Sequence, residues 1–128
     1  MKRGSNGLIF SASDLIRYLS SPFASWMDRY HLENPGALKP DEESEDLKLI
    51  AATGVKHEEN YLDTLTATGV RIASIPMHPW AEAQQLTVAA LDAREPIVYQ
   101  AALSSGNFSG YADFVIFDVE SEIGRAHV

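Results

Sequence analysis

The sequence predicts a mixed α/β (α+β) fold, with helices in the N-terminal part and a β-hairpin near the C-terminus. Two observations indicate this class. Apolar residues recur at helical spacing through the first half of the chain. By contrast, residues 97–119 contain two runs of β-branched and aromatic residues on either side of the turn sequence Ser105-Gly106-Asn107. A length of 128 residues suits one domain with a core of its own.

The composition excludes several classes of protein. With 45% hydrophobic and 22% charged residues, the chain is typical of a globular protein and not of a disordered one. Apolar runs fall short of the roughly 20 residues that span a bilayer, and the run after the basic N-terminus is too short for a signal peptide. The absence of cysteine excludes disulfides and thiolate metal sites. We therefore expect a cytoplasmic protein without a membrane partner.

The formal net charge of −8 argues against a nucleic-acid module that binds through a basic surface alone. It leaves open an enzyme that meets phosphate groups through divalent metal ions.

Two short helices are predicted first. Residues 11–14 form a helix-start cluster, and Ser21-Pro22 starts a second helix with Ser21 as cap and Pro22 at the first helical position. The apolar stripe of the second helix is more typical of a core than of a surface that stacks on bases. Its members are Phe23, Trp26, Met27 and Tyr30.

A long helix should begin at the acidic residues 41–44 and end near Thr68, before Gly69. Glu58 falls near the centre of its apolar stripe, and His57 falls at the edge of that stripe. Glu58 could extend its carboxylate to solvent, or it could pair with a cation such as Lys56 or Arg71. The expected buried face consists of Leu47, Ile50, Ala51, Gly54, Tyr61, Leu62 and Leu65.

The second half of the chain alternates strand and helix. Residues Val70–Ile75 read as a short strand, and Trp80–Ala93 as a helix that Glu95-Pro96 breaks. The hairpin strands should be Ile97–Leu103 and Phe108–Val119.

Asp113 is the least expected residue of this hairpin. It shares a strand face with Tyr111 and Val115, where an ionised carboxylate would lose its hydration unless a metal ion, a cation or several donors met it. On the partner strand, Gln100 lies on the face of Val98 and could hydrogen-bond near Asp113 or to a substrate. It could equally be a polar residue on an open sheet face.

In order and spacing, these segments resemble the N-terminal part of bacterial RecB-like nucleases of the PD-(D/E)XK superfamily. The resemblance runs from Ser11 to about Asp118. Each segment is weak alone, but their succession is fairly specific. The matching segments are Ser-Ala-Ser-Asp-Leu at 11–15 with Ser21-Pro22 and Trp26, Gly54-x-x-His57-Glu58 with Tyr61-Leu62, Ile97-Val98-Tyr99-Gln100-Ala101, and Gly110-x-Ala112-Asp113-Phe114.

The resemblance implies an incomplete restriction-endonuclease-like core over residues 8–121. It implies that His57 and Asp113 are ligands of Mg²⁺ or Mn²⁺. We expect Asp113 and Glu58 to be catalytic residues, with Glu58 either a metal ligand or a neighbour of the ligands, and we expect Gln100 to be the substrate-binding residue. The Asp/Glu-x-Lys pair of the family should follow Glu120 but is absent. No iron–sulfur cluster is expected, because Ser21 stands where many relatives begin the cluster with cysteine. Full-length relatives often continue into a ribonuclease-H-like or helicase region.

The predicted function is therefore that of an N-terminal fragment of a metal-dependent nuclease acting on DNA or RNA. The parent protein would be the enzyme, and this fragment is expected to be inactive. The alternative is a non-catalytic module that binds a partner or nucleic acid on a degenerate nuclease fold. A hydrolase of small phosphate esters is a third possibility.

Residues 122–128 are interpreted as a non-native tail. Their sequence, Glu-Ile-Gly-Arg-Ala-His-Val, is the one-frame translation of a common sequencing adapter read through at the end of a contig. We expect this tail to lack stable packing.

Overall fold

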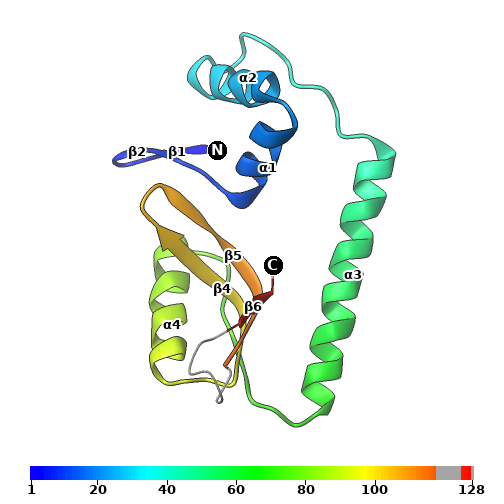
Figure 1. Cartoon of the computed structure of the whole chain (residues 1–128), viewed down its shortest axis with the longest axis vertical. Coiled ribbons are helices and arrows are strands. Elements are labelled where there is room, and N and C mark those ends of the chain that lie inside the picture. Colours follow the sequence, from blue (N-terminus) through cyan, green and yellow to red (C-terminus); the bar gives the residue numbers. More distant parts are fainter. Residues whose placement is uncertain (118–124, 128) are drawn as a thin grey trace. The chain divides into compact units, whose positions relative to one another are not determined.

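The computed structural model describes residues 1–117 and 125–127. Helices and β-sheets both occur in this part of the chain, which confirms the predicted mixed α/β class (Figure 1). The chain divides into two compact units. The first comprises Met1–Asp41 and Ser104–Gly110, and the second comprises Glu42–Leu103 and Tyr111–Val128. No helix in the described ranges is both long enough and apolar enough to cross a membrane.

The first unit begins with a small antiparallel hairpin of β1 (Lys2–Gly4) and β2 (Gly7–Ile9), which was not predicted because three-residue strands carry almost no periodicity. The helices α1 (Ala12–Ser20) and α2 (Pro22–Glu33) follow. Both predicted helix starts are confirmed. The Ser11 side chain caps α1 within a capping box, and the Ser21 hydroxyl caps α2 with Pro22 at the start.

The aromatic face of α2 differs from the expectation of a core. The ring centroids of Phe23 and Trp26 lie 6.1 Å apart, and those of Trp26 and Tyr30 lie 5.4 Å apart, both in stacked arrangements. However, Phe23 is 70% and Trp26 is 56% exposed. Helical spacing places these residues on one face, but burial also requires another element against that face.

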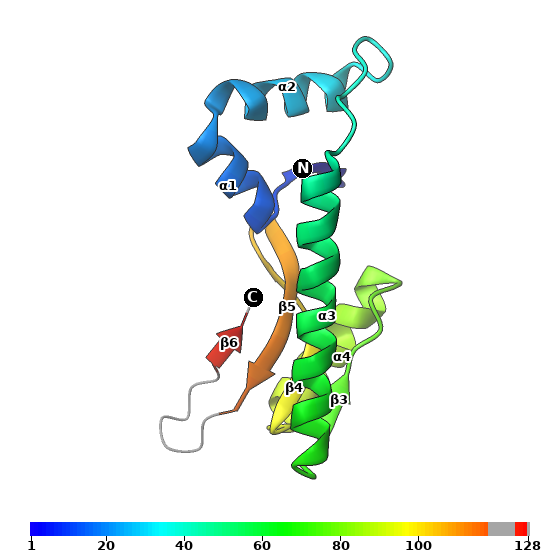
Figure 2. The ribbon, with the colours of Figure 1, turned by 90° about the vertical axis from the view of Figure 1, so that its right-hand side faces the viewer.

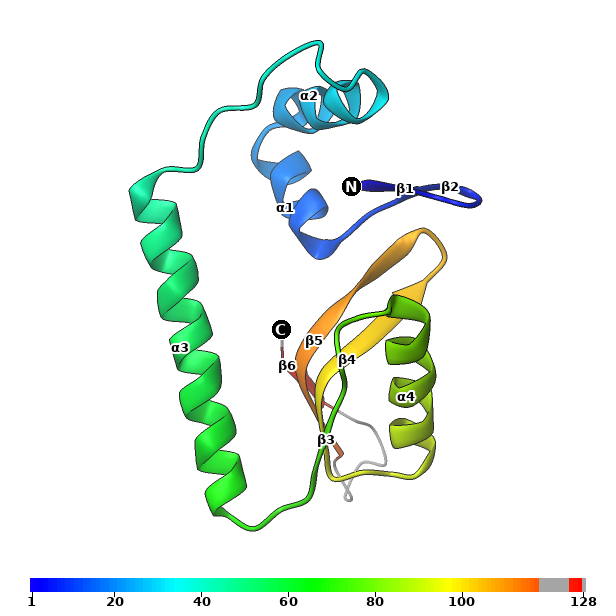
Figure 3. The same ribbon diagram turned by 180° about the vertical axis from the view of Figure 1, so that it is seen from behind.

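The second unit is built around a mixed sheet. It contains the helices α3 (Glu45–Ala67) and α4 (Trp80–Asp92). The strands of its sheet lie in the order β3-β4-β5-β6 and have these bounds: β3 Ile72–Ser74, β4 Ile97–Ser105, β5 Phe108–Ile116 and β6 Arg125–His127. The strands β3 and β4 are parallel and are joined through α4. Figures 1 and 3 show α4 along one side of the sheet and α3 on the other side.

Small residues allow α4 to lie close to the sheet. Ala83 and Ala90 of α4 are buried together with core residues of β4, β5 and the segment after β3. The buried Thr87 joins the two layers, because its hydroxyl donates to the carbonyl of Ala83 at 2.7 Å and accepts the amide of Ala102 at 2.9 Å. The core residues outside α4 are Ile75, Val98, Ala101, Ala102 and Ala112.

The predicted buried face of α3 is half-buried in its second half and exposed in its first half. Ile50 in the first half is 68% exposed, whereas Tyr61, Leu62 and Leu65 are half-buried. Tyr61 meets Phe114 of β5 edge-on, with ring centroids 4.9 Å apart. The end of α3 near Gly69 agrees with the prediction, and the helix starts after Ser44, later than the predicted acidic start (Figure 2).

Part of the predicted non-native tail forms a strand. Residues 125–127 pair antiparallel with β5 as the outermost strand of the sheet, in contrast to the expected absence of packing. Without this strand, β5 would present an unpaired backbone edge, which can pair with a segment of almost any sequence. Residues 122–124 and 128 lie outside the described residues, as does the end of the predicted second hairpin strand.

Replacement of Thr87 by valine should destabilise the protein by about 1–3 kcal/mol, because the buried amide of Ala102 loses its acceptor. Urea unfolding followed by circular dichroism measures this change. Thr53→Val is the matched control. Thr53 makes the same bond to the carbonyl four residues back but is exposed, so its replacement should have little effect. Equal stability of the two variants would contradict the role assigned to Thr87.

Candidate carboxylate site

Among the predicted site residues, Glu58 accepts two hydrogen bonds within the described part of the chain. It lies on the part of α3 that packs against the sheet, and its side chain is half-buried. Its Oε1 atom accepts a hydrogen bond from the hydroxyl of Tyr99 at 2.7 Å and a second from Nε2 of Gln100. All three residues belong to the second compact unit. Glu58 thus links α3 to β4.

An irregular backbone in β4 makes this arrangement possible. Successive side chains of a regular strand point to opposite faces, so Tyr99 and Gln100 should not reach the same atom. Gln100, however, has a φ of 59°, in the left-handed region that residues other than glycine rarely adopt. The alternation is broken there, and both side chains reach Glu58. Gln100 therefore does not simply follow the face of Val98, as a regular strand would require.

Asp113 lies half-buried in β5, near Glu58. Burial raises the pKa of Asp113, and the negative charge of Glu58 raises it further. Within the described residues, Asp113 accepts no hydrogen bond and forms no ion pair. Arg71, considered as a partner for Glu58, is bound to Glu95 at 2.6 Å instead. Two carboxylates thus lie near each other with no described cation to balance them.

Tyr99 is the site residue that the sequence did not indicate. Its hydrogen bond to Glu58 raises the pKa of the phenol, and burial raises it further. Its ring centroid lies 5.2 Å from that of Phe114, which is 3% exposed. The only signal for Tyr99 in the sequence is a polar Tyr-Gln pair in the middle of an otherwise apolar strand.

His57 precedes Glu58 on α3, about 100° further round the helix, and its side chain is exposed. The structure therefore brings together Glu58, Gln100 and Asp113 and leaves His57 at the surface beside them. In the ranges 1–117 and 125–127, no group of three or more His, Cys, Asp or Glu side chains is arranged to hold a metal ion.

The donor set nevertheless fits a hard divalent cation. Mg²⁺ and Mn²⁺ prefer oxygen ligands, and Mg²⁺ is often held by only one or two carboxylates while it keeps several water molecules. Glu58 and Asp113 would be the residues that hold such an ion.

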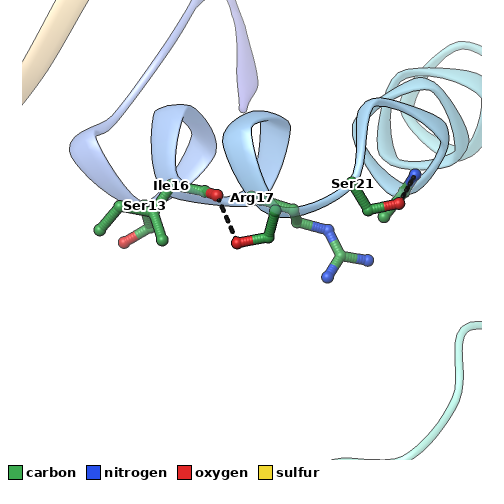
Figure 4. Close-up of a pocket in the computed structure, with 6 residues that line it drawn as sticks. Ser13, Ile16, Arg17 and Ser21 are labelled. Carbon is green, nitrogen blue, oxygen red and sulfur yellow. Dashed lines mark hydrogen bonds between the residues drawn. The ribbon is translucent and has the colours of Figure 1, made fainter.

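A hollow of about 370 Å³ lies along α1 and α2 in the first unit (Figure 4). It is shallow and mostly apolar, and its charged member, Arg17, is bound to Asp28. Its lining contains no carboxylate or imidazole that could act as a general acid or base. The hollow is lined by Ser13, Ile16, Arg17, Ser20, Ser21 and Ala24.

Comparisons with protein-family models, with curated protein sequences and with solved structures find no match for this chain.

Replacement of Asp113 by asparagine should stabilise the protein at neutral pH. Because the pKa of Asp113 is raised in the folded state, the folded protein holds a proton that the unfolded chain releases. The stability of the wild type should therefore fall as the pH rises from about 3.8, the ordinary value for this group, through the raised pKa. The advantage of Asp113→Asn should be largest above that interval and shrink below it.

Urea unfolding between about pH 3 and pH 8 measures how the free energy of unfolding depends on pH. This interval covers roughly the range in which carboxyl groups titrate. Asp63→Asn is the control, because Asp63 is exposed on α3. An Asp113→Asn variant that is less stable than the wild type at neutral pH would show that the carboxylate has a stabilising partner.

Proposed function

We propose that Glu58 and Asp113 form the carboxylate half of a Mg²⁺ or Mn²⁺ site in a nuclease that hydrolyses phosphodiester bonds of nucleic acid. The observation that carries this proposal is the half-buried Asp113, whose pKa is raised by burial and by the negative charge of Glu58, and which has no donor or cation among the described residues. Such a pair is electrostatically unfavourable alone and becomes favourable when a divalent ion lies between its members.

The residues around the pair suit this function. A bound divalent ion would polarise a phosphate oxygen and lower the pKa of a coordinated water molecule. Glu58 and Asp113 supply the negative charge that holds the ion. Tyr99 and Gln100 hold Glu58 in place, and His57 is near enough in sequence to join the site if its side chain turns toward it. The order of the motifs, which resembles that of RecB-like nucleases, is a second and independent support.

A complete site of this kind also needs a further acidic ligand and a lysine, which the described residues do not bring to Glu58 and Asp113. We therefore propose that activity belongs to a longer parent protein and that this chain alone is inactive. A non-catalytic module on the same fold is the alternative if the carboxylate pair binds no metal ion.

The chain should bind Mn²⁺ weakly. Glu58→Gln and Asp113→Asn should each lower the Mn²⁺ affinity by about tenfold or more, because even the loss of a group that only orients a metal ligand has an effect of this size. Electron paramagnetic resonance of free Mn²⁺ in a titration with protein measures the dissociation constant. Glu59→Gln is the matched control, because Glu59 is the exposed neighbour of Glu58 on the same helix. If the control and the two variants lose affinity equally, the ion binds the acidic surface in general and the proposed site is wrong.

The 128-residue chain should show no measurable cleavage of single-stranded DNA, double-stranded DNA or RNA with Mg²⁺ or Mn²⁺. The absence of a single preorganised group that stabilises the transition state lowers a rate by about 10²–10³. Gel assays with labelled polynucleotides test this expectation. Metal-dependent cleavage that survives both Asp113→Asn and His57→Ala would place catalysis elsewhere. Cleavage that Asp113→Asn abolishes would show that this chain needs no further ligand.

A further inference from the structure

The two oxygens of Glu58 have different surroundings. Oε1 accepts both hydrogen bonds, from the Tyr99 hydroxyl and the Gln100 amide. Oε2 accepts none from the described part of the chain. A carboxylate that is held at one oxygen by two donors has little freedom to rotate, and its other oxygen therefore keeps one direction.

Of the two donors, Tyr99 belongs to an aromatic cluster. Its ring packs against Phe114, and Phe114 in turn meets the edge of Tyr61. Tyr61 lies three residues after Glu58 on α3, so the two side chains project from the same helical face. The contact between Tyr61 and Phe114 thus sets the spacing between α3 and the sheet. This spacing lets the Tyr99 hydroxyl reach Glu58.

The charge of the donors is also significant. A lysine or arginine at the position of Tyr99 would also donate to Glu58, but its positive charge would neutralise the carboxylate and compete with a metal ion. The phenol and the amide are both neutral donors. They orient the carboxylate while the pair of acids keeps its full negative charge.

From these contacts we infer that Tyr99 is a positioning residue of the metal site. Its hydroxyl fixes Oε1 of Glu58, and this leaves Oε2 free to bind a divalent cation together with Asp113. Tyr99 acts through Glu58 and does not itself touch the ion. This inference rests on the proposed function, since it requires that Glu58 and Asp113 bind a divalent ion.

The test is Tyr99→Phe, which removes the hydroxyl and keeps the ring against Phe114. The probe is Mn²⁺, with its dissociation constant measured by electron paramagnetic resonance on the full chain. We expect the affinity to fall by about tenfold, the lower end of the effect of losing a group that orients a ligand. Tyr111→Phe is the matched control. Its hydroxyl donates to the carbonyl of Met77 at 2.9 Å in the same unit, and its loss should leave the Mn²⁺ affinity unchanged.

A double-mutant comparison separates positioning from general destabilisation. If Tyr99 acts through Glu58, then Tyr99→Phe should cause no further loss of Mn²⁺ affinity in a Glu58→Gln background. Full additivity in that background, or unchanged affinity of Tyr99→Phe alone, would overturn the inference while leaving the metal site intact. Failure of the wild type to bind Mn²⁺ in a manner that depends on Asp113 would instead remove the proposed function, and the inference with it.

Discussion

The candidate carboxylate site of the second unit depends on two hydrogen bonds. Tyr99 and Gln100 donate them to the same oxygen of Glu58. They connect a long helix to a strand more than thirty residues later in the chain, and they lie beside the aromatic contact between Tyr61 and Phe114. Without them, Glu58 would be an unsatisfied carboxylate on an apolar helix face, which is unfavourable. With them, the helix can lie on the sheet and still present a charge to Asp113.

Two features around this interaction oppose stability. Gln100 adopts a positive φ, and Asp113 has a raised pKa because it is partly buried near another carboxylate. Unfavourable backbone conformations and paired like charges are often concentrated at functional sites, where the surrounding structure maintains them. Here the surrounding structure is a close-packed layer of alanine and valine between α4 and the sheet, with Thr87 satisfying the amide of Ala102. Stability on the α4 side of the sheet thus allows an unfavourable arrangement at the carboxylate pair.

The local signals in the sequence predicted most elements because each signal acts over a few residues. The caps at Ser11 and Ser21, the stop at Gly69 and the hairpin turn near Gly106 all lie where they were expected. The hairpin of β1 and β2 escaped prediction because it is too short to show a period. The first half of α3, and Phe23 and Trp26 of α2, were expected to be buried but are exposed.

By itself, the sequence determined the mixed class, the approximate bounds of the helices and strands, and the presence of two acids, Glu58 and Asp113, where apolar residues would be expected. Periodicity and capping are properties of neighbouring residues, and these can be read without the fold. Only the tertiary structure decided that Glu58 meets Tyr99, that Gln100 breaks the alternation of its strand, and that His57 lies at the surface. Each of these depends on a backbone angle or on a contact between distant segments, and neither leaves a periodic trace in the chain.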